Sequence, residues 1–485
     1  MKIDNKQFLK TSLIYTLVGA FSPLLNLLIQ PAVEGNNLLN ADEFAYIGVG
    51  EIIFNIIFIL CGYSMNNAIA RYYYDFEDDP SQFKKMVSGI FNSVIFRGIL
   101  IAVLMFLFGS WAAKFIQYKE MHDFSSYGYY LLLIGLNMAL IQVASAFFRN
   151  KKAVLAFSLI NLGVGLFRGV FQVISVLFFD TSFIGYFQGS AIGGTIITII
   201  LYIYLIKTYK FYWFPPSARE IYRFSTPLVQ YSIIVWAQQL IEKYFLIQNA
   251  DPTLFAIYNN ALKFALGIQM VLQALQGASQ PEIFRLMKDG INKNKGEIRK
   301  LCNMLIVQTQ LIIAFTIIPA MIFNEFFYET EIKLAAGIIA IVFIRYVFRT
   351  QIIIFGFPIY FMKKTKAFLY INTISIVILI ICNYYLVPRM GYYGAITGAF
   401  ISMTFQTLAI YYYQNKISPI GWNLKKILYY PLALVGITII LEIVKYYTGI
   451  NAYITSGIIT LLIFLSILIQ YNKELKEFTL KKLRK

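Results

Sequence analysis

Six cationic side chains lie inside long apolar segments of this 485-residue chain, where a charge is costly. On membrane-insertion scales each costs roughly 2.5–3.5 kcal/mol at the bilayer centre, so such residues usually face water or a partner. The six are Arg97, Arg168, Lys243, Lys263, Arg345 and Arg349. The acidic residues in comparable segments are Glu51, Glu242 and Glu442. This cationic excess predicts a binding site for an anionic group such as a diphosphate.

Lys263 is the strongest candidate for a residue that lines a cavity. Its segment is unusually polar for a membrane span, since it also carries Asn259, Asn260, Gln269, Gln273 and Gln276. Such polarity suits contact with water better than contact with lipid.

The other five cations also have structural interpretations, which stay open. Lys243 is either a site residue or a lysine whose amine extends to the outer interface. Arg345 and Arg349 lie one helical turn apart, and they bind either substrate or backbone and lipid phosphate groups. Arg97 and Arg168 are either site residues or ties between helices.

Glu51 and Glu242 are the acidic candidates for a counter-ion or a coupling group. Glu51 either neutralises a lysine or carries a coupling proton, so coupling to protons or sodium ions stays open. We find no nucleophile–base pair, phosphate-binding glycine loop or metal-ligand cluster, and the three cysteines have no motif spacing. We therefore expect no catalytic residue, no metal and no cofactor.

The composition indicates the elements that must position these residues. Hydrophobic residues make up 59% of the chain and charged residues 14%, whereas soluble domains carry about a quarter charged residues. Runs that are apolar on every side predict membrane-spanning helices rather than the alternating strands of a barrel. The formal net charge of +18 follows from the loops described below, so no nucleic-acid partner is expected.

Hydrophobic runs between charged or turn-rich breaks predict about fourteen spans. The ranges are 10–32, 44–66, 86–109, 124–148, 153–179, 183–206, 221–247, 254–280, 301–323, 334–361, 367–387, 391–415, 427–444 and 452–471. Lys and Arg then divide unequally: 31 lie in the termini and loops of one side and five on the other. Because cytoplasmic loops carry the positive excess, both termini are predicted to be cytoplasmic.

An internal repeat indicates two halves. The stretch 152–161 recurs as 364–372, and each copy opens a span after a short basic loop. The next span begins with Gly-Tyr-Phe at 185–187 and Gly-Tyr-Tyr at 391–393, followed by glycines four residues apart, which allow close helix packing. The shift of six spans preserves orientation, so the halves are related by an axis along the membrane normal.

The repeat predicts an all-α polytopic membrane protein with two pseudo-symmetric six-helix bundles and two added helices. The bundles cover 1–210 and 217–416, and residues 417–485 form the two C-terminal helices and a basic tail. Two such halves favour a transporter with a cavity between them over a channel or a membrane enzyme.

Several short motifs, in order along most of the chain, resemble the Wzx-type polysaccharide flippases. The start of the twelfth span, Pro388-Arg-Met-Gly-Tyr-Tyr-Gly-Ala, is similar to that family's P-x-x-G-x-x-G-A pattern. Ala68-Ile-Ala-Arg71 with its following acidic patch, Ile241-Glu-Lys243, and Ile257-Tyr-Asn-Asn with Ser279-Gln-Pro281 are also similar to the family.

This resemblance implies a MATE-like fold and the export of undecaprenyl-diphosphate-linked oligosaccharide from the cytoplasmic to the periplasmic leaflet of a bacterial inner membrane. It also implies that spans one, two, seven and eight line the cavity. Expected partners are the lipid-linked oligosaccharide, membrane lipids, a polysaccharide polymerase and glycosyltransferases. The alternatives are a cation-coupled multidrug exporter, a lipid II flippase, and a membrane glycosyltransferase or polymerase. The multidrug alternative predicts an acidic cavity, and the enzyme predicts a large soluble loop with catalytic carboxylates.

The charge asymmetry makes a topological prediction. Cysteines introduced at residues 215, 290 and 480 should be shielded from an impermeant thiol reagent added outside the cell, and cysteines at 37, 120 and 329 should react. A reactive cysteine at residue 480 would place the C-terminus outside and contradict the even number of spans.

Overall fold

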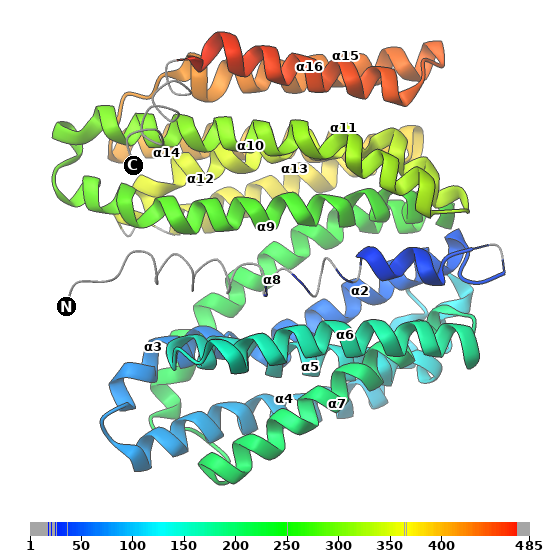
Figure 1. Cartoon of the computed structure of the whole chain (residues 1–485), viewed down its shortest axis with the longest axis vertical. Helices are drawn as coiled ribbons and strands as arrows, with labels where there is room; N and C mark the ends of the chain where they lie inside the picture. Colours follow the sequence, from blue (N-terminus) through cyan, green and yellow to red (C-terminus); the bar gives the residue numbers. More distant parts are fainter. Residues whose placement is uncertain are drawn as a thin grey trace. The chain divides into compact units, whose positions relative to one another are not determined.

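The computed structural model describes residues 18, 21, 25, 27–35, 37–249, 251–362, 364 and 366–472. These residues form helices and no β-strand, apart from an isolated bridge between Glu34 and Leu39 (Figure 1). Contacts divide the chain into two units, Met1–Leu240 and Ile241–Lys485. The boundary lies within α8 (Ala218–Asn249), so this helix belongs to both units.

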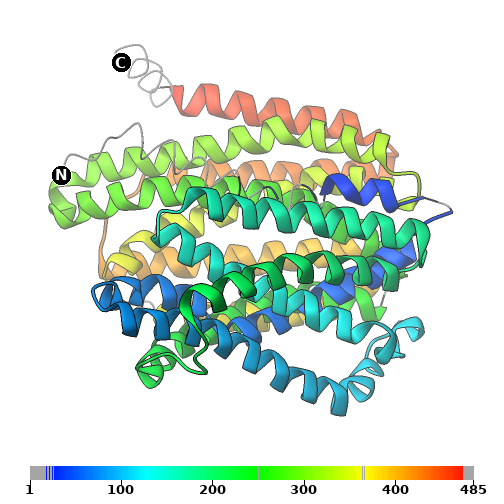
Figure 2. The same ribbon diagram turned by 60° about the horizontal axis from the view of Figure 1, so that its bottom comes forward.

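Unit 1 is a bundle arranged around α5. Its elements are α2 (Ala41–Gly62), α3 (Met65–Phe76), α4 (Pro80–Ala113), η1 (Lys119–Met121), α5 (Phe124–Asn150), α6 (Val154–Phe178) and α7 (Phe183–Tyr209). Helix α5 packs against α2, α3, α4, α6 and α7, and α6 pairs with α7 along its length (Figure 2). The outer surface of α4 presents large apolar side chains such as Phe106 and Leu107, as expected of a surface that contacts lipid.

Unit 2 contains the longest helices of the described chain. Its elements after α8 are α9 (Pro252–Lys288), α10 (Ile291–Phe327), η2 (Glu331–Ile338), α11 (Ile339–Ile344), α12 (Tyr346–Phe361), α13 (Lys366–Met390), α14 (Tyr392–Ile417), η3 (Lys425–Tyr429), α15 (Tyr430–Thr448) and α16 (Ala452–Gln470). Helix α16 packs on α10 and α15 on α11, so the two C-terminal helices are part of this unit (Figure 1).

The helices confirm a polytopic membrane protein. Eleven of the described helices, or runs of helices, are long and apolar enough to cross a bilayer. Helices α8 and α9 correspond to predicted spans seven and eight, and at 32 and 37 residues they are long enough to span, but they are too polar to be among the eleven. Predicted spans two to fourteen thus each match a helix or a run of helices, while most of the first, 10–32, lies outside the described residues.

Two of the predicted loops are wrong. The loop at 281–300 is helical, because α9 continues to Lys288 and α10 begins at Ile291. Most of the loop at 67–85 is helical as well, because α3 runs to Phe76 and α4 starts at Pro80 after an Asp79 cap. Charged residues end a hydrophobic run but not a helix, since lysine, arginine and glutamate are good helix formers. The division of the chain at Leu240 does not test the predicted domains 1–210, 217–416 and 417–485, which stay a prediction.

The glycines of the repeat allow the close helix approach that their spacing predicts. A Cβ atom added to Gly189 of α7 would lie 2.2 Å from the carbonyl oxygen of Phe171 of α6. In the second copy, a Cβ added to Gly394 of α14 would lie 2.4 Å from the carbonyl oxygen of Leu386 of α13. Both helical hairpins therefore depend on the missing side chain, because small residues let helix backbones touch in lipid.

Substitution of these glycines tests the packing. Gly189→Ala and Gly394→Ala should each destabilise the protein by about 1–3 kcal/mol, the usual cost of overpacking. The measurement is the thermal unfolding midpoint of the detergent-solubilised protein. Gly436→Ala is the matched control, because a Cβ at this position of α15 meets nothing within 4 Å. Equal midpoints for all three variants would show that the hairpins do not need the close approach.

Candidate functional site

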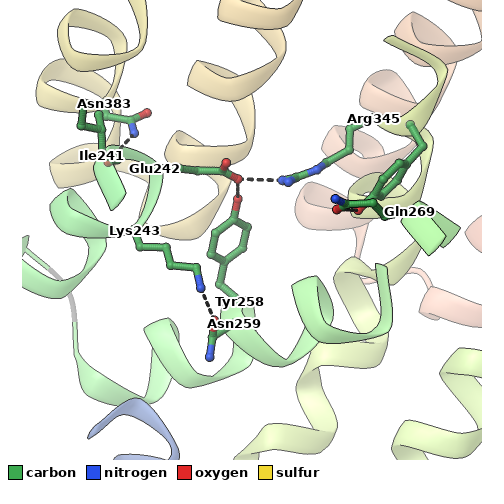
Figure 3. A network of polar contacts seen from close by, with 9 residues as sticks. Ile241, Glu242, Lys243, Tyr258, Asn259, Gln269, Arg345 and Asn383 are labelled. Atoms are coloured by element: carbon green, nitrogen blue, oxygen red, sulfur yellow. Dashed lines mark hydrogen bonds and ion pairs between the residues drawn. The ribbon is translucent and has the colours of Figure 1, made fainter. Parts of the chain in front are cut away.

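A buried carboxylate, Glu242 of α8, is the centre of a polar network in unit 2 (Figure 3). Its Oε1 atom accepts a hydrogen bond from Nη1 of Arg345 at 2.7 Å. The same oxygen accepts a hydrogen bond from the Tyr258 hydroxyl of α9. One carboxylate oxygen therefore joins three helical segments.

The local fold explains how these groups meet. Helices α8 and α9 form a hairpin in which Glu242, near the end of α8, contacts Tyr258, near the start of α9. Arg345 lies at the junction where α11 ends and α12 begins, within a span that starts as the 3₁₀ helix η2. Interrupted helices of this kind commonly place charged groups at transporter sites.

The Arg345–Glu242 pair is well shielded, with side-chain exposures of 18% and 9%. Removing one partner from such a pair typically costs about 3–5 kcal/mol, because the other charge is left buried. The contact is not bidentate, since Arg345 and Tyr258 share one oxygen. The planar guanidinium carries five N–H groups, so Glu242 does not use the full capacity of Arg345.

Lys243 of α8 contacts Asn259 of α9, and Lys263 lies one helical turn beyond Asn259. The Lys243 amine donates to Oδ1 of Asn259 at 2.7 Å (Figure 3). Lys263 follows Asn259 by four residues on α9, so their side chains share one face of the helix. Both lysines are half-buried, and each lies within five residues in sequence of Glu242 or Tyr258.

Arg349 is placed differently from Arg345, although the two lie one turn apart. It is exposed, and no hydrogen bond or ion pair joins it to another residue in the described part of the chain. Tyr346, between them, lies within the electrostatic range of both arginines and directs its hydroxyl at Gln269 of α9, 3.5 Å away. Arg349 is thus a cation available to a group from outside the protein.

The third intramembrane acid of the sequence, Glu442, has a partner that the sequence analysis missed. Lys445, expected in an outer loop, lies in α15 and contacts both Glu442 and the carbonyl oxygen of Gly337 in η2. Through the contact of Lys445 with Gly337, α15 is joined to the interrupted span. The missed signal was their spacing of three residues, which puts both side chains on one helix face.

In unit 1, Arg97 is a tie between helices. Helix α2 ends at Tyr63 and Ser64, which both have left-handed backbone conformations with φ of 47° and 54°. Arg97 of α4 donates to the carbonyl oxygen of Cys61 at 2.8 Å and to the Tyr222 hydroxyl of α8 at 2.7 Å. The last carbonyls of a helix lack helical partners, so Arg97 satisfies a group that the end of α2 leaves open.

Arg168 has a similar setting within unit 1. Its Nε donates to the Ser190 hydroxyl at 3.0 Å and so joins α6 to α7. Glu51 of α2 and Tyr186 of α7 lie within its electrostatic range. The structure thus brings Glu242, Lys243, Lys263 and Arg345 into one region of unit 2, and it gives Arg97 and Arg168 contacts that connect helices of unit 1. Tyr258 is the member of the unit 2 network that the sequence analysis did not select.

The sequence matches no protein-family model and no curated protein. The structure matches solved transporters. A lipid II flippase, MurJ, in an inward closed conformation aligns with a TM-score of 0.69 at 14% identity, over 95% of this chain and 99% of that one. An inward-facing multidrug resistance MATE transporter of the MOP superfamily aligns with a TM-score of 0.67 at 14% identity, over 84% of this chain and 98% of that one.

The chain has the fold of the MOP-superfamily transporters. A MOP superfamily transporter from Pyrococcus furiosus aligns with a TM-score of 0.59 at 12% identity, over 85% of this chain and 96% of that one. That protein is described as having a binding pocket of reversed polarity, suggestive of a different function. The titles of these neighbours describe a flippase and transporters.

The different contacts of the arginines predict different effects on stability. Arg97→Met should lower the thermal unfolding midpoint, because it leaves a buried carbonyl and a hydroxyl without a donor, at about 1–3 kcal/mol for each buried group. Arg349→Met should leave the midpoint nearly unchanged, because Arg349 is exposed. A larger loss of stability for Arg349→Met than for Arg97→Met would contradict these roles.

Proposed function

We propose that the protein is a flippase that moves an undecaprenyl-diphosphate-linked oligosaccharide from the cytoplasmic to the periplasmic leaflet of a bacterial inner membrane by alternating access. The observation that carries the proposal is the extent of the structural match. The match to the lipid II flippase covers 95% of this chain, whereas the matches to the multidrug resistance MATE transporters cover 84–85%. The more complete likeness is therefore to a protein that moves a lipid-linked molecule.

The charges of unit 2 support an anionic substrate. Lys243, Lys263, Arg345 and Arg349 all come from the α8–α9 hairpin and the interrupted span. A diphosphate that crosses the membrane needs compensation, because an unpaired anion in a low dielectric is costly. Arginine and lysine supply it through charge-assisted hydrogen bonds. We assign Arg97 and Arg168 a supporting role in unit 1, because their contacts join helices there.

Two alternative transport functions remain. Lipid II flipping is favoured by the same structural match and by the same need to compensate a diphosphate. Cation-coupled drug export is disfavoured by the basic residues of unit 2, because a cavity for cationic drugs should be acidic.

Proteoliposomes can separate these functions. The purified chain should move a fluorescent undecaprenyl-diphosphate oligosaccharide between leaflets, measured by its accessibility to a membrane-impermeant quencher. Labelled lipid II and ethidium are tested in parallel. Faster movement of lipid II would favour the first alternative, and transport of ethidium without either lipid would contradict the proposal. Complementation of bacterial strains that each lack one flippase class gives an independent answer.

Lys263 provides the residue test. Lys263→Ala should reduce the flipping rate about 10-fold or more, given roughly 1.5–3 kcal/mol for a hydrogen bond to a charged group. Lys263→Arg should retain more activity, and Lys263→Glu should be inactive. Lys333→Ala, at an exposed lysine of η2, is the control. Full activity of well-expressed Lys263→Glu protein would show that the substrate does not use this charge.

A further inference from the structure

Glu242 is an anion that already occupies part of a cationic site. Its Oε1 lies 2.7 Å from Nη1 of Arg345, a distance typical of a charge-assisted hydrogen bond. Glu242 uses one of the five N–H groups of Arg345, so a phosphate that binds this guanidinium competes with Glu242 for its positive charge rather than for every N–H donor. The carboxylate of Glu242 thus already holds the charge of Arg345 that an incoming phosphate would need.

The two anions compete because the surroundings are poor in water. Glu242 is buried, and Arg345 is only slightly exposed. In a low dielectric one guanidinium compensates one anion well, and a second anion beside it raises the energy. A carboxylate that loses its cation in such a place avoids the cost by binding a proton.

We propose, on the basis of the function proposed above, that the substrate diphosphate displaces Glu242 from Arg345 and that Glu242 binds one proton from water as it is displaced. Arg345 stays protonated throughout. One of the two negative charges of the diphosphate replaces the charge that Glu242 loses, and the exposed Arg349 compensates the other. Release of the diphosphate reverses the exchange and returns the proton to water.

Tyr258 allows both states of the carboxyl group. It donates to Oε1 of Glu242 in the ion pair, and the carbonyl oxygen of the protonated acid accepts the same hydrogen bond. Arg349, exposed one turn beyond Arg345, is placed to contact the arriving diphosphate before Glu242 leaves. The exchange thus needs no unpaired charge in the membrane.

The other groups around Glu242 do not replace it as the proton acceptor. Helix α9 contributes Tyr258, and the junction of α11 and α12 contributes Arg345, Tyr346 and Arg349. On α8 itself the neighbouring Lys243 bonds to Asn259, and α13 contributes the neutral amide of Asn383, which lies 3.4 Å from the carbonyl oxygen of Ile241. Glu242 is the carboxylate among these described groups.

The exchange predicts proton uptake on ligand binding. Addition of undecaprenyl diphosphate to the detergent-solubilised protein in weak buffer should take up about one proton for each molecule bound, measured with a pH-sensitive dye. Binding should tighten by up to about tenfold for each unit of decreasing pH, because protonation removes the competing anion. Glu242→Gln should bind without this proton uptake and with little pH dependence. Glu442→Gln is the control, because Glu442 pairs with Lys445 instead.

A charge exchange between the two residues distinguishes this role from a structural ion pair. The double variant Glu242→Arg with Arg345→Glu should recover the thermal stability that either single charge reversal loses. It should still flip undecaprenyl-diphosphate oligosaccharide at least 10-fold more slowly than the unmodified protein, since the guanidinium is on α8. Recovery of both stability and transport would overturn the proposal.

The outcomes separate this inference from the proposed function. Diphosphate binding and flipping without proton uptake, or with proton uptake that persists in Glu242→Gln, would overturn the exchange and leave the flippase function intact. If undecaprenyl diphosphate does not bind at all, both are wrong. If Glu242→Gln does not fold, the transport rate of the charge-exchanged double variant tests the exchange instead. A slow rate supports the exchange, and a normal rate contradicts it.

Discussion

A charge inside the hydrocarbon layer has to be compensated by the protein, and the described structure follows this constraint. Glu242 meets Arg345, and Glu442 meets Lys445. Arg97 donates a hydrogen bond to the carbonyl oxygen of Cys61, which lies at the end of α2 and has no donor within the helix. The contacts of Arg345 and Arg97 join elements that are distant in sequence, and Lys445 does the same through the carbonyl oxygen of Gly337. The charges that make the chain costly to insert therefore also fix where its helices meet.

The hydrophobic pattern predicts the spans well because lipid contact imposes it directly on the sequence. The helix ends beyond the membrane were harder to predict. Residues 281–300 are charged, but they continue α9 and begin α10 with a break only at Asp289 and Gly290. Polarity marks where a helix leaves the hydrocarbon, whereas backbone propensity and capping decide where the helix stops.

The types of residue in the candidate site could be predicted, but their partners could not. Intramembrane cost alone selects Glu242, Lys243 and Arg345. Which cation meets which acid depends on the packing of α8, α9 and the interrupted span, which a hydrophobicity pattern does not contain. Tyr258 is an instructive case. Once α8 and α9 are recognised as consecutive helices that fold back on one another, pairing residues at equal distances in sequence from their connection places Tyr258 opposite Glu242.

The connection between α9 and α10 has a mechanical consequence. Each helix has 37 residues, which at 1.5 Å per residue gives a rod of about 55 Å, longer than the roughly 30 Å of hydrocarbon. Lys263 lies about a third of the way along the α9 rod, and the far end of α9 is joined to α10 by only Asp289 and Gly290. Because α9 is one continuous helix, a tilt of its end outside the membrane also moves Lys263. A conformational change in the aqueous phase is therefore transmitted to the membrane interior by rigid-body motion of α9.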